Sequence, residues 1–110
     1  MISNRIMPLV SEFFKLLSQK KITAAKILLD KIRQDFERTK WNFGYFNALR
    51  GMLLSINSEK SNLLINGLDL SKIPELEKFF QNEIKNRFYD DFDRGFFNGW
   101  ADYIKQLKEG

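Results

Sequence analysis

Apolar residues recur along almost the whole chain at the spacing of an amphipathic α-helix. In the segment 6–17, positions i, i+3, i+4, i+7 and i+11 are all apolar, which is typical of one buried helix face. Stripes of the same kind follow at 25–36, 41–56, 63–65, 73–84 and 92–107. No stretch alternates with the two-residue period of a β-strand. The pattern therefore predicts an all-α fold, a compact bundle of about six helices.

Residues beside these stripes indicate where the helices begin and end. Pro8 suits the first turn of the first helix. Thr23 and Ser71 are expected to be the N-caps of the second and fifth helices, because a hydroxyl can accept a hydrogen bond from a free backbone N–H. Asn66-Gly67 is expected to end the short fourth helix. The third helix is apolar nearly all round, so we expect it at the centre of the bundle.

The two halves of the chain resemble each other at an offset of 51 residues. Residues 44–53 align with 95–104: Gly, Phe and Asn recur identically, and most of the other paired positions keep their apolar character. An internal repeat of this length indicates that one structural unit occurs twice. We therefore expect a single helical domain over residues 1–110, built from two three-helix repeats at approximately 10–58 and 61–110.

Glycines stand at matching places inside the closing helix of each repeat. Glycine in a helix interior costs about 1 kcal/mol relative to Ala, so a shared reason is expected for its presence. Close crossing of the two helices, backbone against backbone, is the natural one, and a groove for a partner helix is the alternative. The predicted helix-packing glycines are Gly44, Gly51, Gly95 and Gly99.

The chain contains neither Cys nor His. This removes thiolate and imidazole metal ligands and the commonest general base. Asp90, Asp91 and Asp93 form an acidic cluster, but Gly95 does not fall at the glycine position of a calcium loop. We expect these carboxylates at a helix N-terminus, where they meet the positive end of the dipole. The sequence thus predicts a protein that is not an enzyme and needs no metal or cofactor.

No apolar run in the sequence approaches the roughly 20 residues that a membrane span requires. The first residues also lack the uninterrupted apolar segment of a secretory signal. A cytoplasmic protein that does not enter a membrane is therefore expected.

Basic residues gather between positions 15 and 40, where eight Lys or Arg stand against three Asp or Glu. Three of the basic residues recur every seven positions, which aligns them if they share one helix. A phosphate backbone could follow such a line. The candidate nucleic-acid contacts are Lys20, Lys21, Lys26, Arg33 and Lys40. The same residues also fit an ordinary solvated face on which acidic neighbours pair locally.

Aromatic residues make up 15% of the chain, and eleven of them are Phe. Their spacing suits a core, but several Phe residues are adjacent in sequence, and two neighbours on a helix cannot both point inward. Some rings are therefore expected at the surface, where an apolar patch marks a protein-binding site. The candidates are Phe14, Phe79 and Phe97. The partner can be another protein or a second copy of the chain.

The stretch Gly44-Tyr45-Phe46-x-Ala48-Leu49-x-Gly51-Met52 resembles a Gly-aromatic-x-x-Ala-Leu-x-Gly-Met pattern of small archaeal helical proteins. Among these are the accessory subunits of the archaeal family-B replicative DNA polymerase. The resemblance covers about ten residues and a degenerate copy at 95–104, and it implies a role in tuning a polymerase complex by binding it. Those subunits also carry an acidic C-terminal tail, which this sequence lacks. Either the chain is a different relative or a tail is missing from it.

Two functions stay open at this point. The first is a non-enzymatic protein-binding module, an accessory subunit of a DNA replication or polymerase complex. The second is a nucleic-acid-binding protein that uses a basic helix face.

Overall fold

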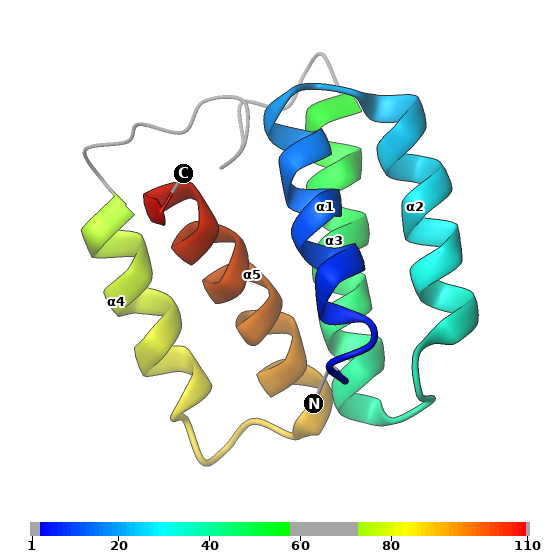
Figure 1. The fold of residues 1–110 in the computed structure, drawn as a ribbon. Coiled ribbons are helices and arrows are strands. Elements are labelled where there is room, and N and C mark those ends of the chain that lie inside the picture. Colours follow the sequence, from blue (N-terminus) through cyan, green and yellow to red (C-terminus); the bar gives the residue numbers. More distant parts are fainter. Residues whose placement is uncertain (1–2, 58–72, 110) are drawn as a thin grey trace.

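The computed structural model describes residues 3–57 and 73–109 (Figure 1). These residues form five α-helices: α1 Met7–Ser18, α2 Ile22–Asp35, α3 Lys40–Asn57, α4 Ile73–Ile84 and α5 Asp91–Glu109. No strand occurs in either described range, so the all-α prediction is confirmed. The helix count differs from the expected six. The short helix expected at 63–65, its Asn66-Gly67 end and the Ser71 cap lie outside the described residues.

The first residues of the helices show which of the predicted N-terminal signals are present in the structure. Pro8 occupies the first turn of α1, as expected. Thr39 caps α3, where its Oγ1 accepts a hydrogen bond of 3.1 Å from the Asn42 N–H. The predicted cap Thr23 is wrong, because α2 begins at Ile22 without a side-chain cap. Thr23 therefore lies inside the first turn, where its hydroxyl cannot serve as the N-cap.

The start of α5 repeats the start of α3. Asp90 Oδ1 accepts a hydrogen bond of 3.0 Å from the Asp93 N–H, which is the same bond as the one at Thr39, 51 residues later. Asp91 and Asp93 lie in the first turn, where negative charge meets the positive end of the helix dipole. α4 thus begins 51 residues after α2, and α5 begins 51 residues after α3.

The end of α1 is closed by a left-handed residue that is not glycine. Lys20 has a φ of 57°. Its N–H donates to the Leu17 carbonyl at 3.0 Å, and the Lys21 N–H donates to the Leu16 carbonyl at 2.9 Å. These two bonds satisfy carbonyl groups that the helix end would otherwise leave free. The chain then turns back into α2.

The helices alternate in direction: α1, α3 and α5 run one way, and α2 and α4 the other (Figure 1). α3 contacts α1, α2 and α5, while α4 packs on α5. Most of the largest fully buried side chains come from α1, α3 and α5, among them Phe13, Leu17, Tyr45, Leu49, Met52 and Ile104, and Ile32 joins them from α2. The core therefore lies where these three parallel helices meet.

α3 and α5 approach each other closely at their matched glycines. A Cβ atom on Gly44 would lie 2.7 Å from the Phe92 carbonyl carbon, and one on Gly95 would lie 2.8 Å from the Trp41 carbonyl carbon. Both distances are far inside van der Waals contact. Because residues 41 and 92 are themselves matched in the repeat, the two contacts are reciprocal, as a pseudo-twofold axis requires.

The other two predicted packing glycines differ from each other. A Cβ atom on Gly99 would lie 2.8 Å from the Cβ atom of Ala48, so this position belongs to the same close contact. Gly51 does not: a Cβ atom there would meet nothing within 4 Å. Gly51 lies on a part of α3 that no neighbouring helix approaches closely, so its expected packing role is corrected.

We expect Gly44→Ala and Gly95→Ala each to lower the free energy of unfolding by at least about 2 kcal/mol. The added methyl group must push two helix backbones apart. Gly51→Ala is the matched control, because its Cβ position is open. There the helix propensity of Ala is expected to raise stability by up to about 1 kcal/mol. Urea unfolding followed by circular dichroism measures all three, and equal effects would contradict the close crossing.

Candidate functional site

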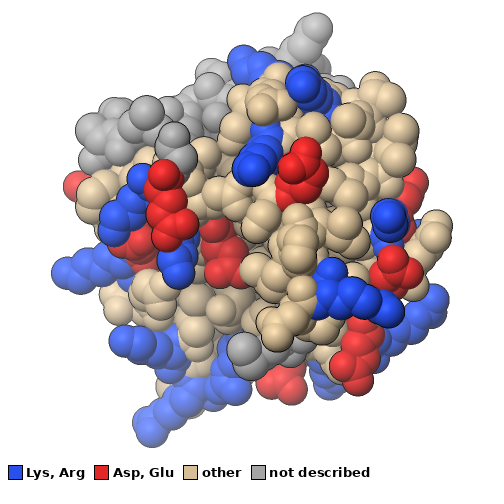
Figure 2. Space-filling view, in the orientation of Figure 1, with Lys and Arg blue, Asp and Glu red and all other residues tan. Residues whose placement is uncertain are grey.

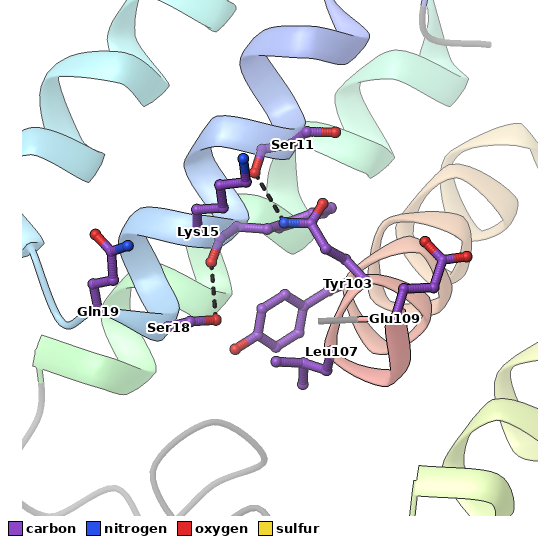
Figure 3. A pocket seen from close by; sticks show the side chains of 9 residues that line it. Ser11, Lys15, Ser18, Gln19, Tyr103, Leu107 and Glu109 are labelled. Atoms are coloured by element: carbon purple, nitrogen blue, oxygen red, sulfur yellow. Dashed lines mark hydrogen bonds between the residues drawn. The ribbon is translucent and has the colours of Figure 1, made fainter.

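A groove of about 710 Å³ lies between α1 and α5. Its lining includes Phe14, Lys15, Gln19, Tyr103, Leu107 and Glu109. Figure 3 shows Tyr103 and Leu107 reaching from α5 toward Ser18 of α1. The floor is apolar, and the exposed side chains of Lys15 and Glu109 place one charge of each sign on the rim. We call this feature the α1–α5 groove.

The two walls of the α1–α5 groove are held in place by contacts between the helices. Gln106 Nε2 donates a hydrogen bond of 3.0 Å to the Ser11 carbonyl (Figure 3). The rings of Phe14 and Tyr103 pack with centroids 5.2 Å apart. Burial raises the pKa of the Tyr103 phenol, and a hydrogen bond with Ser18 opposes part of this rise. The phenol therefore stays neutral at physiological pH and adds no charge to the floor of the groove.

The three predicted partner-binding rings lie in different environments. Phe14 is only 2% exposed, so its expected surface position is wrong. It belongs to the core and contributes to the floor of the α1–α5 groove. Phe79 on α4 is 50% exposed. Phe97 on α5 is half-buried and stacks on Tyr89 with centroids 5.4 Å apart.

Two exposed rings were not predicted. Phe88, in the turn between α4 and α5, is 86% exposed, and Phe43 on α3 is 44% exposed. The helix that carries Phe43 was predicted to be apolar nearly all round and central. Periodicity could not tell that the bundle leaves part of this helix open.

The five predicted nucleic-acid contacts are all exposed, but they do not form one line. α2 ends at Asp35, and Phe36 after it has an extended backbone. Lys40 is therefore the first residue of α3 rather than a continuation of the row through Lys26 and Arg33. The expected seven-residue spacing along one helix is corrected, because the chain turns within it. On the face shown in Figure 2, acidic and basic side chains are interspersed.

Arg33 instead lines a second, smaller cavity at the turn between α2 and α3. This cavity has a volume of about 310 Å³ and is lined by Arg33, Gln34, Phe36, Arg38 and Phe43. We call it the α2–α3 cleft. It brings together two guanidinium groups and an exposed ring, a combination that the sequence did not predict.

A buried polar pair ties α3 to α5. The Tyr45 hydroxyl donates a hydrogen bond of 2.6 Å to Asp102 Oδ2. Burial, and then the nearby Asp102 carboxylate, raise the pKa of Tyr45. Burial also raises the pKa of Asp102, against the opposing effects of the Tyr45 hydrogen bond and of Lys105. Tyr45 is only 1% exposed and Asp102 is partly buried, so their hydrogen bond links the two helices inside the bundle.

Two carboxylates of the acidic cluster have partners at the start of α5. Asp90 caps the helix, and Asp91 Oδ1 lies 3.9 Å from Arg94 Nη1. The described residues hold no group of three or more acidic, Cys or His side chains placed to bind a metal ion. None of the five described helices is both long and apolar enough to cross a membrane.

Comparisons with known protein families, with curated proteins and with solved structures found no match to this chain. No relative therefore assigns a role to any residue of the α1–α5 groove or the α2–α3 cleft.

The raised pKa of Asp102 predicts a pH dependence of stability. The folded protein binds the Asp102 proton more tightly than the unfolded chain does, where the pKa of an Asp carboxyl is about 3.9. The contribution of Asp102 to stability is therefore full below that pH and is lost as the pH rises through the folded pKa. Asp102→Asn removes this titration and keeps an oxygen that can accept the Tyr45 hydrogen bond.

Urea unfolding of both proteins across this pH range gives the test. The stability of the wild type relative to Asp102→Asn is expected to fall as the pH rises from about 4 and then to level off. The contributions of the other carboxylates cancel in the difference between the two free energies of unfolding. A difference that is independent of pH, or that grows with pH, would contradict the assignment.

Proposed function

We propose that the chain is a non-enzymatic protein-binding module that docks an amphipathic helix of a partner protein in the α1–α5 groove. The observation that carries this proposal is the form of the groove, about 710 Å³ between two helices, with an apolar floor. Recognition of a helix in a groove uses such a surface: apolar anchors enter the groove, and polar residues stay at its edges.

The chemistry of the lining specifies the occupant further. Leu107, which is partly buried, offers apolar surface to the anchors of the partner, and each well-buried anchor contributes about 1.5–3 kcal/mol. Lys15 favours an acidic residue on one flank of the partner helix, and Glu109 a basic residue on the other. The partner is therefore expected to be an amphipathic helix with charges of both signs rather than a strongly basic or acidic segment.

The class of partner that we propose to test first is a replicative DNA polymerase complex, because residues 44–52 resemble a pattern of polymerase accessory subunits. Most residues of that pattern, including Gly44, Ala48 and Leu49, are buried where α3 meets α5. They support the fold and do not reach a partner. The polymerase proposal thus needs evidence from binding at the α1–α5 groove.

We expect Leu107→Asp to weaken partner binding at least tenfold, because it places a charge among the apolar anchors. Leu107 is half-buried, so its stability is measured alongside. Ile27→Asp, on the exposed face of α2, is the matched control. An archaeal family-B polymerase is titrated against each protein by calorimetry.

The same three proteins also serve as baits in an extract of the source organism. Proteins held by the wild type and by Ile27→Asp, but not by a folded Leu107→Asp, define the partner for direct titration. If no protein distinguishes the baits, the docking role of the α1–α5 groove is rejected. If Leu107→Asp unfolds, the charge reversals Lys15→Glu and Glu109→Lys at the rim replace it.

A further inference from the structure

We propose that the α2–α3 cleft binds single-stranded nucleic acid, with one unpaired base stacked on Phe43 and its neighbouring phosphate held by Arg33 and Arg38. The cleft lies at the turn between α2 and α3 and shares no lining residue with the α1–α5 groove. The inference therefore goes beyond protein docking and does not depend on it.

Phe43 provides a fixed aromatic platform. Its ring is 44% exposed, although it stands on a helix of the bundle. Phe36 holds the ring from one side, with centroids 5.5 Å apart and planes nearly perpendicular. Phe36 in turn stacks on Phe46 at 5.6 Å. The ring therefore keeps part of its surface free for a base, and stacking on such a ring is a main source of affinity for unpaired strands.

Arg33 and Arg38 supply positive charge beside this ring. Both side chains are exposed, and within residues 3–57 and 73–109 neither forms an ion pair. Arg5 adds a third guanidinium near the same turn, where its Nη2 donates a hydrogen bond of 3.1 Å to the Asp35 carbonyl. Asp35 at the end of α2 and Glu37 after it are the acidic residues of this turn, and the three guanidinium groups outnumber them by one. Guanidinium groups suit phosphate because their donors form a planar fork.

The turn that carries Arg38 is ordered before any ligand binds. Asn42 is buried, and its Nδ2 donates a hydrogen bond of 2.7 Å to the Glu37 carbonyl. The Thr39 N–H donates to the same carbonyl at 3.0 Å, and the Thr39 hydroxyl caps α3. Little of this backbone has to be ordered on binding, so the entropic cost of binding is small.

The geometry favours an unpaired strand over a duplex. A cleft of about 310 Å³ beside an exposed ring accommodates a base that has left its stack, whereas bases in a duplex hide their faces. A duplex would instead need a row of basic residues, and the row through Lys26 and Arg33 stops where α2 ends. Stacking and phosphate contact in one place are features of single-strand binding proteins.

Fluorescence anisotropy with a labelled 15-nucleotide oligothymidine, at about 50 mM salt, tests the proposal. Phe43→Leu keeps an apolar side chain but removes the aromatic face, and it is expected to weaken binding about fivefold or more. Phe79→Leu changes a ring of similar exposure on α4 and is expected to leave binding unchanged. Arg33→Gln and Arg38→Gln are each expected to weaken binding and to reduce its salt dependence by about one phosphate contact.

Three results would overturn the proposal: no binding by the wild type at this salt concentration, equal affinities of Phe43→Leu and Phe79→Leu, or a hairpin duplex that binds as tightly as the single strand. Loss of protein capture in Phe43→Leu with unchanged oligonucleotide binding would identify the cleft as a protein contact instead. Leu107→Asp, if folded, is expected to bind the oligonucleotide as the wild type does. Failure at the cleft and failure at the α1–α5 groove can therefore be told apart.

Discussion

The fold depends on the close crossing of α3 and α5, where backbone meets backbone at Gly44 and Gly95. A side chain at either position would separate the two helices and disturb the core that they share with α1. The helices lie closest near their N-terminal ends and diverge toward their C-terminal ends (Figure 1). This divergence leaves space beside the C-terminal half of α5, and the α1–α5 groove lies there. The tight contact at one end thus shapes the open surface at the other.

The sequence predicted this crossing because glycine recurs at equivalent positions of two helices, 51 residues apart. Two glycines in equivalent helical positions are costly, and only a shared close contact compensates for that cost. Gly51 stands at a similar place in the pattern but has open space around it. A glycine in a helix therefore indicates a close contact where its repeat partner is also small, as Gly44 is to Gly95 and Ala48 is to Gly99. Residue 102, the partner of Gly51, is an Asp.

The positions that were mispredicted share one cause. Helical periodicity defines the faces of a helix, but it does not tell which apolar face the bundle covers, so Phe14 was expected at the surface although it is buried. It also does not detect a helix end without Gly or Pro, such as the one at Asp35. The predicted row of basic residues through Arg33 and Lys40 therefore crosses the turn between α2 and α3, so its members do not share one helix. The α2–α3 cleft forms at that same turn, and no pattern along a single helix could predict it.

The two surfaces lie at opposite ends of the bundle. The α1–α5 groove is formed by the C-terminal parts of its two helices, and the α2–α3 cleft lies where α3 begins, at the other end (Figure 1). A helix bound in the groove therefore leaves the cleft open. If both proposals hold, the protein holds a partner helix and an unpaired strand at once, and the α3–α5 pair fixes the distance between them. In the proposed role, the effect of the protein would lie in where it places its two ligands.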